Sequence, residues 1–130
     1  MKKSLAILTG VLAIATSVSV SAGTTYTGYN TTVGDQNGSG YTGYDQEKTT
    51  RGANGNIKSG SVGGIYVVDV RMQDQQGNNG AWTRNVTDGT NASLGGHTNH
   101  IKGDLMRAEF SNDIGTPVDV QVTGSWRSDN

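Results

Sequence analysis

Two runs of alternating residues constrain the fold of this chain more than any other feature. In Ile65–Met72, every second residue from Tyr66 onward is apolar. In Val118–Arg127, the valines at 118, 120 and 122 and then Trp126 alternate with polar residues. A period of two is typical of a β-strand that buries one face. The predicted core is Val68, Val70, Met106, Phe110, Val120, Val122 and Trp126.

Shorter strand patterns surround these runs. We predict strands at Ile57–Val62, Ala81–Thr87 and His100–Phe110, separated by turns rich in Gly, Asn and Asp, with residues 88–99 mostly loop. In Ala81–Thr87, alternation would place Trp82, Arg84 and Val86 on one face. No segment after residue 22 has a sustained apolar stripe of helical period. The pattern predicts an all-β protein, either a small antiparallel β-sandwich or a partly open barrel.

The first 22 residues are typical of a secretory signal peptide. Lys2 and Lys3 precede an apolar stretch from Leu5 to Val20, and Val20-Ser21-Ala22 ends it with small residues at the cleavage positions. The apolar stretch contains Thr, Ser and Gly and is too short for a typical membrane-spanning helix. We expect cleavage near Ala22 and a secreted protein, extracellular or periplasmic, with no integral membrane segment in the mature chain.

The mature composition excludes several functional classes. Without Lys2 and Lys3, 8 basic and 11 acidic residues remain, so the net charge changes from −1 to −3. Scattered, mildly acidic charge disfavours nucleic-acid binding, which needs clustered Lys and Arg. There is no cysteine, which excludes disulfides, thiolate catalysis and cysteine-bound metals. The fold must therefore depend on its core and its sheet hydrogen bonds.

The region 23–56 is polar and contains an internal repeat. Tyr26-Thr27-Gly28-Tyr29-Asn30 recurs as Tyr41-Thr42-Gly43-Tyr44-Asp45. We expect this region to form an arm or hairpin with little burial, next to a β-sandwich core at 57–130. Tyr offers a large apolar ring and a hydroxyl, so one pair of rings is a candidate binding surface. The candidate binding residues are Tyr26, Tyr29, Tyr41 and Tyr44, with Tyr29 and Tyr44 expected to be exposed and Tyr26 and Tyr41 to be anchored.

No catalytic residue or cofactor is predicted from the motifs. His97 and His100 are the only histidines, and in a strand or loop their spacing places them on opposite or unrelated faces. No Gly-x-Ser-x-Gly motif is present, and the carboxylates are dispersed. Asp35, Asn37 and Ser39 resemble the opening of a calcium loop, yet Gln46 stands where that loop requires Glu. These three residues are a weak calcium candidate.

The C-terminal segment carries a resemblance to known proteins. Residues 103–110, a turn and the segment Val118–Asp129 resemble the close of small secreted bacterial all-β proteins that end in a V-x-G-x-W-x-x-D strand. That resemblance implies an all-β fold and brings no activity with it. In size, secretion, lack of cysteine and all-β composition, the chain is also similar to lactococcin-type bacteriocins.

We therefore expect a secreted, non-enzymatic binding protein of the cell envelope or extracellular matrix. Its expected partner is a cell-wall glycan, another envelope protein or a second copy of itself. The first alternative is a bacteriocin-like antimicrobial protein, and the second is a small secreted hydrolase. Inhibition of related strains by purified protein separates the first alternative from a binding role.

Overall fold

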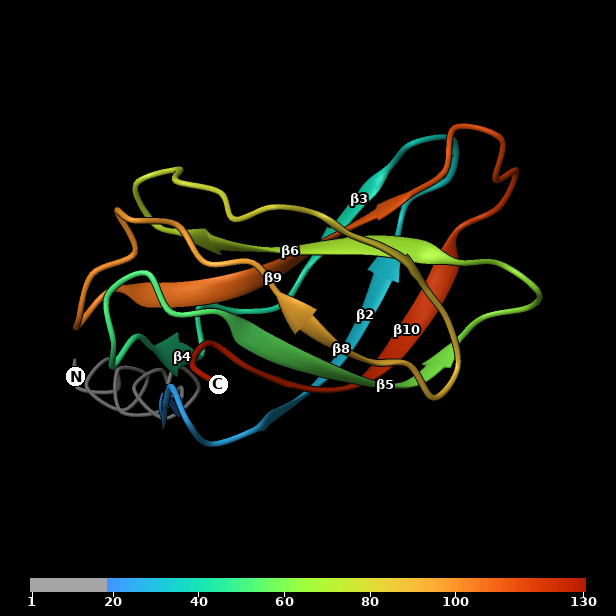
Figure 1. The fold of residues 1–130 in the computed structure, drawn as a ribbon. Coiled ribbons are helices and arrows are strands. Elements are labelled where there is room, and N and C mark those ends of the chain that lie inside the picture. Colours follow the sequence, from blue (N-terminus) through green and yellow to red (C-terminus); the bar gives the residue numbers. More distant parts are fainter. Residues whose placement is uncertain (1–18) are drawn as a thin grey trace, which may run out of the picture.

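The two alternating runs lie in different sheets, which pack face to face (Figure 1). The computed structural model describes residues 19–130; most of the predicted signal peptide lies outside them. Within 19–130 the chain contains strands and no helix, so the predicted all-β sandwich is confirmed. Consistent with this, no helix that could cross a membrane occurs in the described part of the chain.

The six-stranded sheet contains the first alternating run. Its strand order is β1-β4-β9-β6-β7, with β3 also paired to β9. All its pairs are antiparallel except β1 with β4. Its strands are β1 (Ser21–Ala22), β3 (Ser39–Tyr41), β4 (Gln46–Glu47), β6 (Val68–Asp74), β7 (Thr83–Val86) and β9 (Leu105–Asn112).

The four-stranded sheet contains the second run and has the order β2-β10-β5-β8. All three of its pairs are antiparallel. Its strands are β2 (Thr27–Val33), β5 (Gly55–Val62), β8 (Asn91–Leu94) and β10 (Val120–Arg127). The predicted loop over 88–99 therefore includes a short strand, because Asn91–Leu94 pairs with β5 at the sheet edge.

The core between the sheets contains every predicted core residue, together with others such as Ile57, Met72 and Leu94. All seven predicted core residues are at most 1% exposed. Met106, Ala108 and Phe110 share the inner face of β9, as their alternation predicts. Burying such side chains stabilises the fold by roughly 1.5–3 kcal/mol each. The inward-facing side chains of the six-stranded sheet are therefore packed in the core, and the side chains of its other face lie outside the core.

Four of the predicted strands begin later than their apolar patterns suggest, and one of them, β7, starts at Thr83 rather than at Ala81. β6 starts at Val68, since pairing with β9 begins at Val68 and Asn112, and Ile65 is 93% exposed in a Gly-rich loop. β10 starts at Val120, and Val118 is 47% exposed. β9 starts at Leu105, because residues 101–104 form a turn closed by the hydrogen bond from Asp104 N to Ile101 O.

A bulge in β7 interrupts the alternation, so Trp82, Arg84 and Val86 do not share one face as expected. Val68 pairs with Val86, but Val70 pairs with Thr83, so β7 has one residue more than β6 over this stretch. Asn85 takes up the extra residue with a φ of 58°. Because of this bulge, Val86 points into the core while Arg84 is exposed on the other side.

Residues 23–56 are not a separate arm. They include β2, which pairs with β10 over seven residues, and β3 and β4, which both pair with β9. Both sheets therefore depend on this region. Its low hydrophobicity suggested weak burial, but strand pairing uses the backbone and needs few apolar side chains.

Candidate functional site

The outer face of the six-stranded sheet carries charged, polar and aromatic side chains side by side. Alternate residues of its strands point away from the core and form cross-strand rows. We call this surface the charged face. It consists of Ser39, Tyr41, Asp69, Arg71, Gln73, Trp82, Arg84, Arg107, Glu109 and Ser111.

The central row of the charged face joins an aromatic ring to an ion pair. Arg71 on β6 lies opposite Glu109 on β9. The Nε of Arg71 donates to Glu109 Oε1 at 2.7 Å. The Arg71 guanidinium also lies 4.2 Å from the Trp82 ring centroid, within cation–π range. Trp82 is thereby positioned by a side chain that is itself fixed by Glu109.

A second ion pair lies beside this row. Arg84 Nη1 donates to Asp69 Oδ2 at 2.6 Å, and the backbone N–H of Asn85 donates to Asp69 Oδ1 at 3.0 Å. The β7 bulge is what points the Asn85 N–H at this carboxylate. Asp69 and Glu109 are each 7% exposed, and each is ion-paired with an arginine.

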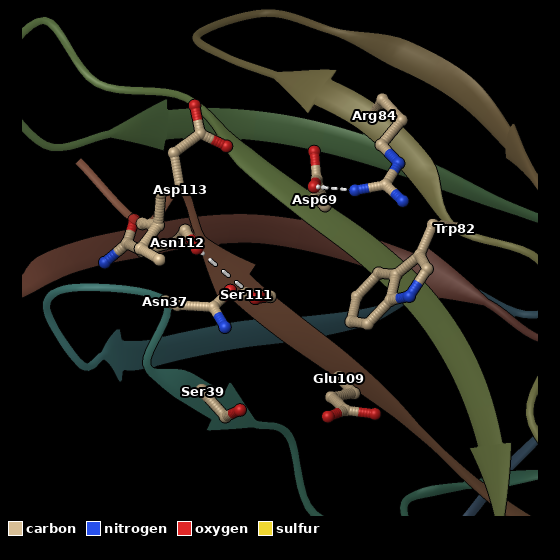
Figure 2. A pocket seen from close by; sticks show the side chains of 10 residues that line it. Asn37, Ser39, Asp69, Trp82, Arg84, Glu109, Ser111, Asn112 and Asp113 are labelled. Atoms are coloured by element: carbon tan, nitrogen blue, oxygen red, sulfur yellow. Dashed lines mark hydrogen bonds and ion pairs between the residues drawn. The ribbon is translucent and has the colours of Figure 1, made fainter. Parts of the chain in front are cut away.

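An open cavity of about 540 Å³ lies over these two rows. Figure 2 shows the Trp82 ring projecting over the sheet on the side of Asp69 and Glu109. The cavity combines one aromatic ring with carboxylate, amide, hydroxyl and guanidinium groups. Its lining residues are Asn37, Ser39, Asp69, Trp82, Arg84, Glu109, Ser111, Asn112, Asp113 and Ile114.

A second aromatic cluster lies at the β3 side of the charged face. The Arg107 guanidinium lies 3.9 Å from the Tyr41 ring centroid and 4.8 Å from that of Tyr44. Arg107 Nε donates to Gln73 Oε1 at 2.8 Å. One ring face of Tyr41 is therefore covered by a guanidinium, while 41% of the residue remains exposed.

The four predicted tyrosines do not form one surface. Tyr41 and Tyr44 lie beside Arg107, but Tyr29 is 8% exposed and packs on Phe110 with ring centroids 5.0 Å apart. Burial raises the pKa of Tyr29 to about 12. The expectation that Tyr29 is exposed and Tyr41 anchored is therefore wrong. Pairing of β2 with β10 turns Tyr29 toward the core.

Tyr26 lies on the other sheet. Lys58 Nζ is 4.2 Å and the Arg127 guanidinium 4.7 Å from its ring centroid, and its hydroxyl donates to Asn56 Oδ1.

The aromatic residue that completes the charged face is Trp82, which the sequence did not single out as a site. The sequence pattern that could have indicated this site is the presence of Trp82 and Arg84 at alternate positions of one predicted strand.

Two of the calcium candidates, Asp35 and Asn37, lie in the turn between β2 and β3, and Ser39 is the first residue of β3. Asp35 N donates to Asp119 Oδ1 at 3.0 Å, and Asn37 has a φ of 67°. Asn37 and Ser39 line the cavity, whereas Asp35 is not among its lining residues. Across residues 19–130, no group of three or more His, Asp or Glu side chains is arranged to hold a metal. The sequence pattern therefore remains the sole argument for a calcium site in this turn.

The two histidines lie together, contrary to the expectation of unrelated faces. Their ring centroids are 5.5 Å apart. His100 is fully buried, and its Nε2 lies 2.9 Å from the Asn78 carbonyl oxygen. The turn formed by the hydrogen bond from His100 N to His97 O brings both rings to one side.

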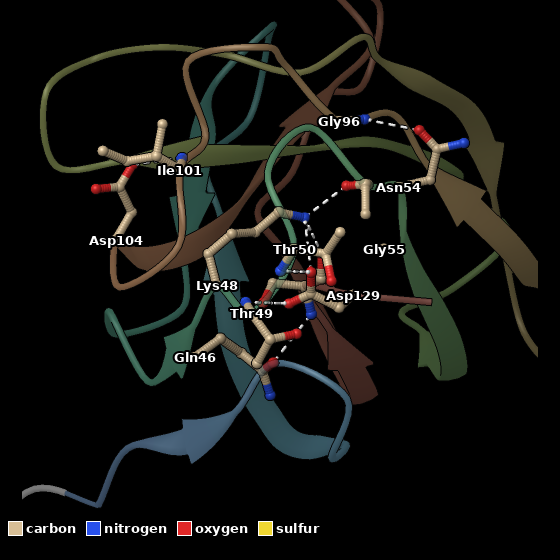
Figure 3. Close-up of polar contacts among 12 residues, drawn as sticks. Gln46, Lys48, Thr49, Thr50, Asn54, Gly55, Gly96, Ile101, Asp104 and Asp129 are labelled. Atoms are coloured by element: carbon tan, nitrogen blue, oxygen red, sulfur yellow. Dashed lines mark hydrogen bonds and ion pairs between the residues drawn. The ribbon is translucent and has the colours of Figure 1, made fainter.

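A buried polar cluster ties the C-terminal residues Ser128 and Asp129 to the segment that follows β4 (Figure 3). Lys48 is 1% exposed, and its Nζ donates to Ala53 O and Ser128 O and lies 3.3 Å from Asp129 Oδ1. Burial lowers the pKa of Lys48, although the Asp129 charge opposes this. Burial alone would raise the pKa of Asp129, but amides of Thr49 and Thr50 and the Lys48 charge lower it overall. Lys48 and Asp129 are 1% and 2% exposed, so neither charge is accessible to a ligand.

Comparison of the chain with protein-family models, curated proteins and solved structures found no match.

Proposed function

We propose that this protein is a secreted, non-enzymatic β-sandwich that binds a glycan of the cell envelope or extracellular matrix through its charged face. The observation that carries the proposal is the placement of Trp82 beside two ion-paired carboxylates over an open cavity. A flat aromatic ring packs against the C–H face of a sugar. Fixed carboxylates accept hydrogen bonds from its hydroxyl groups.

The charge balance supports a neutral, hydroxyl-rich ligand. The arginines of the charged face, Arg71, Arg84 and Arg107, stand against its two carboxylates, Asp69 and Glu109, and against Asp113, which lines the adjoining cavity. An anionic polymer such as nucleic acid would meet these carboxylates and be repelled. A sugar hydroxyl both donates and accepts, so it can use the carboxylates and the guanidinium groups together.

Binding to insoluble polysaccharides tests the proposal. Purified protein without residues 1–22 would be incubated with peptidoglycan, chitin and cellulose, and the bound fraction measured after sedimentation. We expect the wild-type protein to sediment with at least one of them and Trp82→Ala to lose about nine-tenths of that binding, since stacked aromatics dominate many interfaces. Tyr26→Ala is the matched control, because it removes a cation-flanked ring from the opposite sheet. Equal binding by Trp82→Ala and wild type would refute the proposal.

A second candidate function is a bacteriocin-like antimicrobial protein that contacts membranes. The observation in its favour is a set of exposed apolar side chains at one end of the sandwich. Ile65 is 93%, Ile114 78% and Val118 47% exposed, in the β5–β6 and β9–β10 loops. Those loops lie at the same end because Val62 pairs with Val122 and Val68 with Asn112. Growth inhibition that disappears in Ile65→Ser/Ile114→Ser, but not in Trp82→Ala, would favour this function over glycan binding.

A further inference from the structure

We infer that the charged face binds an extended glycan of at least three sugar rings, laid across the strands from Trp82 to Tyr41. This inference rests on the proposed function and adds the length and direction of the ligand.

The strand register places the two aromatic rings at opposite ends of one row. Tyr41 on β3 pairs with Glu109 on β9, and Glu109 pairs with Arg71 on β6. Trp82 precedes β7, the next strand, and stacks on Arg71. The backbone positions of the row therefore cross three strand spacings, a distance of about 14 Å, which is about the length of three pyranose rings in an extended chain.

The middle of the row is polar. The Arg71–Glu109 ion pair lies between the aromatic ends, and neighbouring rows add the Arg107–Gln73 hydrogen bond on one side and Asp69 and Ser111 on the other. A sugar over the centre would therefore meet hydrogen-bonding groups, and the sugars at both ends would meet flat apolar rings. This order matches a linear oligosaccharide lying across the sheet.

Each terminal ring is fixed before the ligand arrives. The guanidinium groups of Arg71 and Arg107 lie 4.2 Å from Trp82 and 3.9 Å from Tyr41, and each arginine is itself hydrogen-bonded by Nε. Ordered side chains lose little conformational entropy on binding. Both ends of the row are therefore ready to stack, and a ligand that spans them gains from both.

A length series tests this inference. Cello-, chito- and manno-oligosaccharides of one to six units would be titrated into the full mature protein by calorimetry, with tryptophan fluorescence as a second readout. The fluorescence change would come from Trp82, because the other tryptophan, Trp126, is fully buried. We expect the affinity for at least one series to rise at least about tenfold from one to three units and then to level off. An affinity independent of length would overturn the inference while leaving the proposed function in place.

Two variants locate the ends of the ligand. Tyr41→Ala should leave the affinity for one unit within about twofold of wild type and remove the roughly tenfold advantage of three units. Trp82→Ala should weaken binding of every length, and Tyr26→Ala should change none. If Tyr41→Ala keeps the advantage of three units, the ligand does not cross the sheet as inferred. If none of the three series binds and Trp82→Ala sediments with polysaccharides as wild type does, the proposed function fails as well.

Discussion

The Arg71 guanidinium lies 4.2 Å from the centroid of the Trp82 ring. The same arginine donates to Glu109, so one side chain orients both the aromatic ring and a carboxylate of the candidate site. Lysine cannot replace it here, because an ammonium group has neither the planar stacking surface nor the directed Nε–H.

Arg71→Lys should therefore weaken glycan binding while the fold persists. We expect roughly a tenfold loss of affinity for the polysaccharide that wild type retains, since the charge remains but Trp82 and Glu109 lose their common partner. Sedimentation binding measures the loss, and thermal melting checks the fold. Arg51→Lys is the control, because Arg51 is exposed and donates from Nε to Thr98 O. Unchanged binding by Arg71→Lys would show that its stacking on Trp82 is incidental.

Val70→Asp should unfold the domain. Val70 is fully buried at the centre of β6, and an aspartate there would place an unpaired charge in the core. Circular dichroism should show loss of the β signal or of a cooperative melt. Val118→Asp makes the same change at a site that is 47% exposed and should melt close to wild type. A Val70→Asp protein of wild-type stability would contradict the packing described above.

The two copies of the tyrosine repeat should respond differently to alanine. Tyr29→Ala should lower the free energy of unfolding by about 3 kcal/mol, because a buried ring in contact with Phe110 is removed. Tyr44→Ala should lower it by less than about 1 kcal/mol, since Tyr44 is half-buried beside Arg107. Urea denaturation measures both. Equal losses would mean that the repeats have equivalent environments, against the structure.

Lys48→Met should destabilise the fold by about 3–5 kcal/mol, because it leaves the buried Asp129 carboxylate without its cation. Replacing both partners, in Lys48→Met/Asp129→Asn, should recover part of that loss, since no unpaired charge remains. Chemical denaturation of the single and double variants measures the difference. A double variant that is less stable than Lys48→Met would show that the Asp129 bonds to Thr49 and Thr50 outweigh the ion pair.

Acidification from pH 8 to pH 5 should destabilise the protein through His100. Burial lowers the pKa of His100 below its ordinary 6.5, while the Asn78 carbonyl, through its hydrogen bond, and Asp74 partly oppose this. The unfolded chain then binds more protons than the folded chain below about pH 6.5, so stability falls as the pH drops through that value. The neutral ring is favoured because, within residues 19–130, the buried Nδ1 has no hydrogen-bond partner to which a protonated ring could donate.

Thermal melts over this pH range check the effect. His100→Gln should be less stable than wild type at pH 8, but its stability should change less on acidification. His97→Gln, altered at the neighbouring ring, should keep the wild-type pH dependence. A wild-type melting temperature that is equal at pH 8 and pH 5, together with an unchanged slope in His100→Gln, would rule out this role for His100.

The core was predictable because burial in a strand repeats every two residues, and that period is visible in a short segment. Val68, Val70, Val120 and Val122 are all buried as their alternation predicts. The charged face was partly visible in the same way, since Asp69 and Arg71 occupy the opposite side of the same run. Strand ends were less predictable. Ile65 fits the strand pattern of the sequence, but β9 ends at Asn112, opposite Val68, so Ile65 has no partner on that strand and is exposed.

The partners across the sheet required the tertiary structure. Arg71 and Glu109 are separated by 38 positions, and only the β6–β9 register brings them together. The tyrosine repeat shows the same limit, since Tyr29 is buried while Tyr44, at the same position of the second copy, is only half-buried. Tyr29 lies opposite Gly124 of β10, where a Cβ would be 2.6 Å from the Tyr29 hydroxyl. Gly124 therefore leaves room for the Tyr29 side chain. The sequence around Tyr29 does not show that β10 is the strand beside it, so only the tertiary structure could reveal this contact.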